Sequence, residues 1–390
     1  MKVAVLNCFS RNGLATINSI SNDIELFGGY SSRNKSRTFL SYFFKSKKVK
    51  DIFPYTSPEA DSEQFKEDII SAIKKFKLAG IIPAGTIPSN FLSIHKKEII
   101  KRTNAKIFIE DYATFRILND KWSTYKLCKS YDIPVPKTIL LSDVLYSSAL
   151  LSKFSFPVVI KPRSLYGSQG FKIIASKIHL LNFFKNRKDI LFEVFTKNSY
   201  IMQEYVEGNI HDVNLFSWRG EIKSVLSQER LVTMNDFGGG GVINRTTNEK
   251  DIMQLSEKIV KKTGWSGIAN FEYLKNPNGK CYLLECNPKI WGTTQLTIES
   301  GLNVIDQYVN CLLKEKEIDR VEYYKINMVY RWIFPWCVSS WFTSPLSIRH
   351  ILTRISKTFK RYDSETDIHN LKVDELRHLF GIVINKLNIL

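Results

Sequence analysis

The sequence lacks an apolar run long enough to span a bilayer, and it is short of acidic residues. It holds 38 Asp and Glu against 56 Lys and Arg, a formal net charge of +18. Its six cysteines form no Cys-x-x-Cys, and none lies near a histidine at metal-ligand spacing. A zinc site is therefore not indicated, and isolated thiols are typical of a reducing compartment. Residues 1–7 lack the pattern of a signal peptide, so we expect a cytoplasmic protein.

The excess positive charge is concentrated in two segments. Residues 31–50 carry seven Lys and Arg, residues 331–361 carry six, and neither has an acid. Such charge favours the binding of nucleic acid, anionic lipid or phosphorylated ligands, and it does not indicate which of these is bound. Trp332, Trp336 and Trp341 suggest peripheral contact with a membrane, but a core position is the more common role of such side chains. No nucleic-acid-binding signature is present, so we rank nucleic acid last.

The first 115 residues alternate predicted strands and helices. This order predicts a parallel sheet with helices on both faces. No Gly-x-Gly-x-x-Gly follows the first strand, so a dinucleotide site is not indicated. The predicted strands are 3–6, 79–82 and 106–109. Residues 61–77 are predicted to form an amphipathic helix, and a second helix is predicted over about 89–102.

A buried strand that ends on a lysine leads into a glycine-containing loop. Residues 156–161 form the strand, and a second strand follows at 171–174. Glycines let backbone N–H groups approach phosphate oxygens, and a lysine supplies a positive charge. A phosphate cradle and an ordinary hairpin both fit this pattern. The candidate residues are Lys161, Gly167, Ser168, Gln169 and Gly170.

Residues 200–208 form a strand that runs into a short linker. Such a linker between two lobes can offer its backbone to the edge of an adenine, although its acidic side chains can equally be ordinary solvated groups. The candidates are Gln203, Glu204, Tyr205 and Val206.

Four consecutive glycines, 238–241, lie further along the chain. Glycine weakens a strand interior, so we expect a mobile loop here. The loop is either a plain linker or a lid over bound phosphates. Arg230 and Arg245 flank it, and we take both, with Lys289, as candidate catalytic residues.

A hairpin predicted over 267–287 carries three oxygen donors. Glu272 ends its first strand, and Glu285 and Asn287 lie two apart on the second, so both point to one face. Hard oxygen ligands of this kind suit Mg²⁺, which binds few protein groups and shares its shell with phosphates. An ordinary acidic surface hairpin is the alternative.

Taken in order, these motifs resemble the ATP-grasp superfamily. The series is Asp120-Lys121, Ile133-Pro134-Val135-Pro136, residues 158–170, residues 203–208, Glu272 and residues 285–289. The likeness extends from about residue 1 to 315. It is similar to the group that holds D-alanine–D-alanine ligase, biotin carboxylase and carbamoyl phosphate synthetase.

The resemblance implies mixed α/β and α+β structure. We expect a Rossmann-like domain (1–115), a two-lobed ATP-grasp domain (116–315, with lobes about 116–200 and 201–315) and a basic, aromatic C-terminal extension (316–390). It also implies ATP with Mg²⁺ or Mn²⁺ as cofactors. Lys121 and Lys161 match the family's phosphate-binding lysines, residues 203–206 match its adenine hinge, and Glu272, Glu285 and Asn287 match its metal ligands.

Three positions depart from the family's pattern. Ile210 stands where many members place a ribose-binding glutamate, so His211 or Asp212 would substitute. Lys289 replaces an arginine, which keeps the charge and loses the planar fork. Asn270 stands where D-alanine ligases place an arginine, which argues against that substrate.

The activity implied is joining a carboxylate to an amine, or another nucleophile, through an acyl phosphate. The positive charge favours small substrates that are acidic or phosphorylated, and a glycan-linked precursor near the membrane is a further candidate. A homo-oligomer is compatible with the sequence. The alternative function is a non-catalytic ATP-binding protein that docks a partner or an anionic membrane surface through its basic C-terminal segment.

Overall fold

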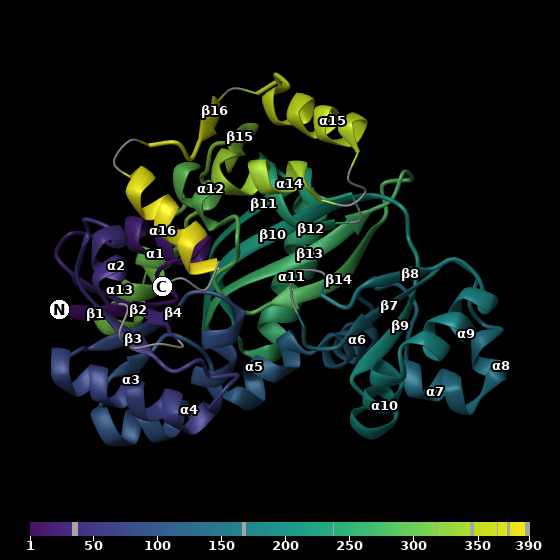
Figure 1. Cartoon of the computed structure of the whole chain (residues 1–390), viewed down its shortest axis with the longest axis horizontal. Helices are drawn as coiled ribbons and strands as arrows, with labels where there is room; N and C mark the ends of the chain where they lie inside the picture. The colour runs from purple at the N-terminus through teal and green to yellow at the C-terminus, as the bar shows by residue number, and fades with distance from the viewer. Residues whose placement is uncertain are drawn as a thin grey trace. The chain divides into compact units, whose positions relative to one another are not determined.

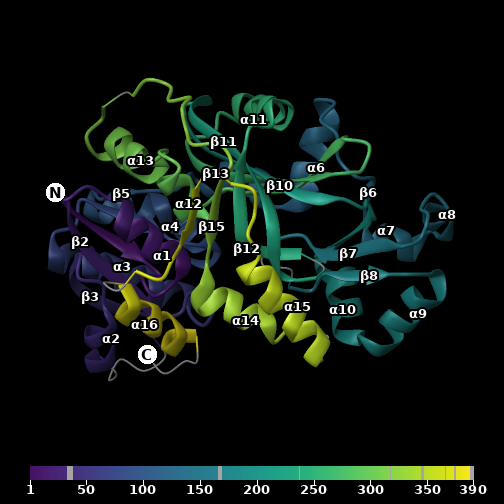
Figure 2. The same ribbon diagram turned by 90° about the horizontal axis from the view of Figure 1, so that it is seen from above.

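The computed structural model describes residues 1–32, 38–165, 169–236, 238–316, 318–343, 347–364, 366–372 and 375–386. The chain divides into two compact units. The first comprises Met1–Phe115, Asp212–Asn270 and Asn287–Leu390, and the second comprises Arg116–His211 and Phe271–Cys286. Figures 1 and 2 show their elements in two views. Each unit is described by itself, and the domain boundaries expected from the sequence stay predictions.

The N-terminal part of the first unit is a parallel sheet, as the alternating pattern predicts. Its order is β3-β2-β1-β4-β5, and each neighbouring pair is parallel. The central strand is apolar and buried along nearly its whole length, as expected for a strand covered on both faces. The strands are β1 (Lys2–Leu6), β2 (Glu25–Ser31), β3 (Val49–Tyr55), β4 (Gly80–Pro83) and β5 (Lys106–Ile107). The helices are α1 (Arg11–Ser19), α2 (Thr38–Phe44), α3 (Ser62–Phe76) and α4 (Thr86–Thr103), and α5 (Tyr112–Asn119) begins in this unit and ends in the second.

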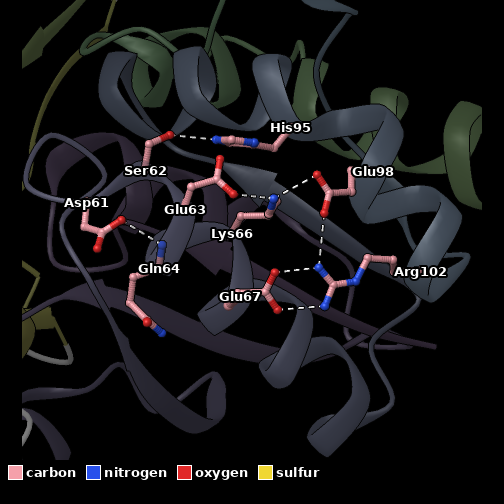
Figure 3. A network of polar contacts seen from close by, with 9 residues as sticks. All are labelled: Asp61, Ser62, Glu63, Gln64, Lys66, Glu67, His95, Glu98 and Arg102. Carbon is pink, nitrogen blue, oxygen red and sulfur yellow. Dashed lines mark hydrogen bonds and ion pairs between the residues drawn. The ribbon is translucent and has the colours of Figure 1, made fainter.

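Helices α3 and α4 are joined by the polar network in Figure 3. The Lys66 ammonium lies 2.6 Å from a Glu63 oxygen and 2.8 Å from a Glu98 oxygen. Arg102 binds Glu67 and also donates to Glu98 at 3.2 Å. These contacts fix α4, whose N-terminus carries a residue of the candidate site.

The first unit also contains most of a second sheet. The whole sheet has the order β14-β13-β10-β11-β12-β15-β16, and β10, β13 and β14 each continue into the second unit. Its strands are β10 (Asn209–Trp218), β11 (Glu221–Asn235), β12 (Gly238–Thr247), β13 (Gly267–Lys275), β14 (Cys281–Asn287), β15 (Met328–Arg331) and β16 (Thr366–His369). The helices of this part are α11 (Lys250–Thr263), α12 (Thr294–Glu299), α13 (Val304–Leu313), η1 (Ile333–Cys337), α14 (Val338–Trp341), α15 (Ile348–Phe359) and α16 (Leu376–Lys386).

The four-glycine run is a strand, so the prediction of a mobile loop was wrong. It begins β12, where Gly238 pairs with Asn235 and Gly241 pairs with Thr233 of β11. The long partner strand supplies the hydrogen-bond ladder, which outweighs the entropy that glycine loses. Register shifts interrupt this ladder, and Gly238 and Gly239 adopt φ of 119° and 84°, which favour glycine.

Two of the three C-terminal tryptophans belong to the core. Trp332 is 2% exposed and Trp336 is 6% exposed, in a cluster with Val242 and Leu379. The core alternative is therefore confirmed for these two side chains, and neither can insert into a membrane. No helix in the described ranges is long and apolar enough to cross a bilayer.

The second unit is built on an antiparallel sheet of order β6-β9-β7-β8. Its core includes Val158, Ile160 and Met202. The strands are β6 (Thr138–Leu140), β7 (Val158–Pro162), β8 (Lys172–Ile174) and β9 (Tyr200–Glu204). The helices are α6 (Lys121–Ser130), α7 (Leu141–Tyr146), α8 (Ser148–Leu151), α9 (Lys177–Asn186) and α10 (Lys188–Lys197).

Candidate functional site

Lys161 is a buried lysine on a central strand of the second unit. Strand β7 lies between β8 and β9, so its lysine is held among ordered neighbours. The side chain is 8% exposed, and its Nζ donates to the Leu284 carbonyl at 3.3 Å. Burial lowers the pKa of Lys161 to about 8; Glu285 and Glu272 oppose this shift, and Lys121 adds to it. An anion placed beside Lys161 stabilises the charged form of this lysine, so the position favours anion binding.

Lys121 brings a second positive charge to the same place. It is the first residue of α6, and Asp120 caps that helix by accepting from the Ser123 N–H at 2.7 Å. The Lys121 ammonium lies 3.0 Å from a Glu285 oxygen and donates to the Leu165 carbonyl at 2.8 Å. We call Lys121, Lys161, Glu272 and Glu285 the lysine–glutamate cluster. All four belong to the second unit.

The glycine loop after β7 is described only in part. Gln169 and Gly170 are exposed, and the predictions at Gly167 and Ser168 lie outside the described residues. Gly170 has φ of 70°, and an added Cβ would lie 2.6 Å from a Pro162 ring carbon. This close approach requires glycine. The phosphate-cradle role of the loop stays a prediction.

The predicted adenine hinge begins at the end of β9. The Gln203 side chain is buried and donates to the Thr138 hydroxyl at 2.9 Å, so it has a structural partner. Glu204 is exposed, and its backbone N–H donates to the Lys137 carbonyl at 2.8 Å. Tyr205 and Val206 follow the strand, outside its ladder. Adenine recognition by this segment stays a prediction.

In the first unit, Arg230 forms a bidentate ion pair with Asp212. The guanidinium donates through Nε and Nη2 to the two carboxylate oxygens, the Nε contact being 2.9 Å. Its Nη1 donates to the Gly239 carbonyl at 2.8 Å, which ties the glycine-rich end of β12 to this pair. Asp212 is fully buried and also accepts from Gln228 at 2.9 Å and from Asn270 at 3.3 Å. We call these four side chains the buried arginine network.

Asn287 and Lys289 extend this network toward the N-terminal sheet. The Asn287 amide donates to the Asn270 side-chain oxygen at 3.2 Å. Lys289 is 8% exposed, and its ammonium donates to the Thr86 hydroxyl at the start of α4. The sequence reasoning missed Thr86, because a lone threonine at a helix start carries no signal of its own. Gly85, which precedes Thr86, has φ of 107°, and the sequence alone does not show this conformation.

Arg245 has a cross-strand partner. It faces Glu229 in the β11–β12 ladder and donates to it through Nε at 2.6 Å. Its side chain is 30% exposed. His211 is buried and belongs to the second unit. The catalytic role expected for Arg245 and the ribose role expected for His211 or Asp212 stay predictions.

Arg11 is a half-buried cation that the sequence did not single out. It begins α1 and donates to the carbonyls of Gly241 and Gly292, the first at 2.8 Å. Its guanidinium carbon lies 4.1 Å from the centroid of the Trp332 ring. The aromatic face and the two carbonyls stabilise its charge. No sequence pattern marks such a residue, since its partners lie more than 200 positions away.

The donor chemistry of the cluster fits a hard cation. Glu285 and Glu272 both raise the pKa of Lys161 through their negative charges, so both carboxylates face the environment of this lysine in the second unit. In the described ranges no group of three His, Cys, Asp or Glu gathers as a metal cage. Two carboxylates suit Mg²⁺, which keeps much of its shell for water and phosphate, while Asn287 belongs to the first unit and its role as a ligand stays a prediction.

Comparison with known proteins identifies the domain that carries these residues. Residues 118–293 match the model of the ATP-grasp domain, so this part of the chain is an ATP-grasp domain. The resemblance seen in the motifs is thereby confirmed.

A curated relative is the D-aspartate ligase of Enterococcus faecium. It is 26% identical over 257 residues, which cover 61% of this chain and 59% of the relative. The chain thus spans about three fifths of the length of the relative it matches.

Two solved structures share the fold. Biotin carboxylase from Campylobacter jejuni has a TM-score of 0.67 at 17% identity, over 84% of this chain and 74% of its own. The L-amino acid ligase from Bacillus licheniformis has a TM-score of 0.62 at 14% identity, over 84% of this chain and 78% of the ligase chain. The mixed α/β and α+β fold class expected from the sequence is confirmed.

Proposed function

We propose that this protein is an ATP- and Mg²⁺-dependent ligase that joins a carboxylate to an amine. The observation that carries the proposal is the lysine–glutamate cluster within an ATP-grasp domain. In this cluster the two lysines can bind the oxygens of a polyphosphate, and the two carboxylates can bind its metal ion.

Each member of the cluster has a separate task. Lys121 and Lys161 hold phosphate oxygens, and a phosphate beside Lys161 restores the charge that burial opposes. Glu272 and Glu285 would hold Mg²⁺, and Asn287, two residues after Glu285 on β14, is the third ligand that the sequence predicts. When bound, Mg²⁺ neutralises charge on the transferring phosphoryl group.

The reaction proceeds in two transfers. A carboxylate oxygen of the first substrate attacks the γ-phosphorus of ATP, and the bond to the ADP oxygen breaks. The amine nitrogen then attacks the carbonyl carbon of the acyl phosphate, inorganic phosphate leaves with the bonding electrons, and the nitrogen loses a proton. Lys289, held by Thr86, supplies a fixed positive charge for the substrate carboxylate or the oxyanion.

We propose an amino acid as one of the two substrates. The D-aspartate ligase and the L-amino acid ligase are both named for amino acid substrates. The net charge of +18 favours an acidic one. Acidic amino acids are therefore the first to test, followed by sugar acids and phosphorylated carboxylates.

The test is phosphate release from ATP with pairs of carboxylates and amines. We expect release above background with at least one pair, and formation of a hydroxamate when hydroxylamine replaces the amine. Glu285→Ala and Lys161→Ala should remove this activity. Glu322→Ala, a change at a side chain that is 75% exposed, is the matched control and should retain it.

Two results would overturn the proposal. One is binding of Mg·ATP without turnover under every substrate pair, which describes a nucleotide-binding protein instead. The other is full turnover by Glu285→Ala and Lys161→Ala, which would place the site elsewhere.

A further inference from the structure

Helix α15 packs against the first unit through its polar face. Arg354 is 2% exposed, donates to the Thr233 carbonyl at 2.7 Å and lies 3.0 Å from an Asp236 oxygen. Thr358 is also buried, and its hydroxyl accepts from the Trp341 indole N–H at 3.0 Å. Figures 1 and 2 show α15 beside α14 in both views. Polar contacts thus hold the helix in place.

The outward face of the same helix is apolar. Ile348 is 79% exposed, Leu352 59% and Phe359 63%, and Ile355 is half-buried between them. At about 100° per residue these four positions lie within roughly 60° of one another. We call them the apolar stripe. An ordinary surface helix buries its apolar face, so this orientation is reversed and marks an interaction surface.

Basic side chains accompany the apolar stripe: at 100° per residue Arg349 lies about 60° beyond Leu352, whereas Lys357 lies on the side of the helix away from the stripe. Arg349, Lys357 and Lys360 are exposed, and Arg361 follows them. No acidic residue occurs between 347 and 361. An exposed apolar stripe with a basic border is the pattern of a helix that lies in the plane of an anionic bilayer surface.

We propose that α15 docks this protein on an anionic lipid surface. The apolar stripe enters the boundary between headgroups and acyl chains, while Arg349 beside the stripe and Lys360 at the end of the helix bind lipid phosphates. A single helix presents this face. A second copy would suit it less well, because a symmetric contact would bring the two sets of cations together. The proposal goes beyond ligase activity, which it does not require.

Sedimentation of the full chain with lipid vesicles tests this proposal. We expect binding to phosphatidylcholine vesicles that contain phosphatidylglycerol, and none to phosphatidylcholine alone. Salt should weaken the binding, because it screens exposed charges. Ile348→Ser with Leu352→Ser should lower the partition coefficient at least tenfold, because two apolar side chains no longer leave water.

Two further sets of variants test whether the basic side chains contribute to lipid binding and whether the effect is specific to α15. Replacing Arg349 and Lys360 by Gln should lower the partition coefficient by roughly fivefold per residue. The matched control is Ile178→Ser with Leu181→Ser on α9, where the two side chains are 69% and 60% exposed. This control should bind vesicles as the unaltered protein does.

The proposal fails if neutral and anionic vesicles bind equally well, if the α15 double variant binds normally, or if the α9 control loses binding equally. It also fails if anionic vesicles do not bind and light scattering shows that the α15 double variant turns a dimer into a monomer. In that case the apolar stripe is an interface between copies. Thermal unfolding should be nearly unchanged in the α15 double variant, since both altered side chains face solvent.

Discussion

Lys161 should make nucleotide binding depend on pH. Its pKa is lowered to about 8 by burial in the unliganded protein. Phosphate oxygens placed beside the ammonium favour the charged form and raise that pKa. Above pH 8 the free protein must therefore take up a proton to bind, so the affinity for nucleotide falls as the pH rises.

The size of the effect follows from the pKa. With a pKa of about 8, roughly nine tenths of Lys161 is charged at pH 7 and roughly one tenth at pH 9. The affinity for ADP should therefore fall about tenfold between these values, or ~1.4 kcal/mol. The phosphates of ADP are essentially ionised across this range and contribute little to the change.

Isothermal titration calorimetry with ADP at pH 7, 8 and 9, in the presence of EDTA, measures how the affinity for ADP depends on pH. EDTA removes divalent ions, which would otherwise bind near Glu272 and Glu285 and change the effect of these carboxylates on the pKa of Lys161. Lys161→Arg keeps a permanent charge and should abolish the pH dependence. Lys172→Met removes an exposed charge on the neighbouring strand β8 and should preserve it. Equal ADP affinity at pH 7 and pH 9 in the unaltered protein would refute the reasoning.

Two further predictions concern stability, measured by urea unfolding. Gly241→Ala would place its Cβ 2.0 Å from the buried Asn244 side chain and should cost about 1–3 kcal/mol, whereas Gly240→Ala meets nothing within 4 Å and should cost much less; equal losses would contradict this. Arg230→Met leaves the Asp212 carboxylate buried without its cation and should cost about 3–5 kcal/mol. Adding Asp212→Asn should restore part of that loss, and a strictly additive double variant would argue against the pairing.

The sequence predicted the parts of the fold that local patterns determine. Alternating apolar runs gave the parallel sheet around β1, and the periodicity of residues 61–77 gave α3 within a residue at each end. The hairpin over 267–287 also formed, with its turn closed by the Gly279 N–H bonding to the Asn276 carbonyl. For the helix and the hairpin the signal lies within about 20 residues of chain, and the sheet follows from the order of such local signals along the chain.

The features that the sequence missed depend on distant partners. The run 238–241 is a strand only because β11, a partner of 15 residues, lies beside it. Arg11 and Thr86 meet their partners across more than 200 residues. The tryptophans near 332 suggested a membrane surface, whereas the exposed apolar face belongs to α15. Composition cannot tell which face of a helix is buried.

The most direct test of the proposed ligase is transfer of oxygen from the carboxylate to phosphate. The carboxylate that stimulates turnover is labelled with ¹⁸O, and the inorganic phosphate released from ATP is analysed by mass spectrometry. An acyl phosphate predicts one ¹⁸O atom in each phosphate released in coupled turnover. Unlabelled phosphate, or label in AMP, would contradict the account.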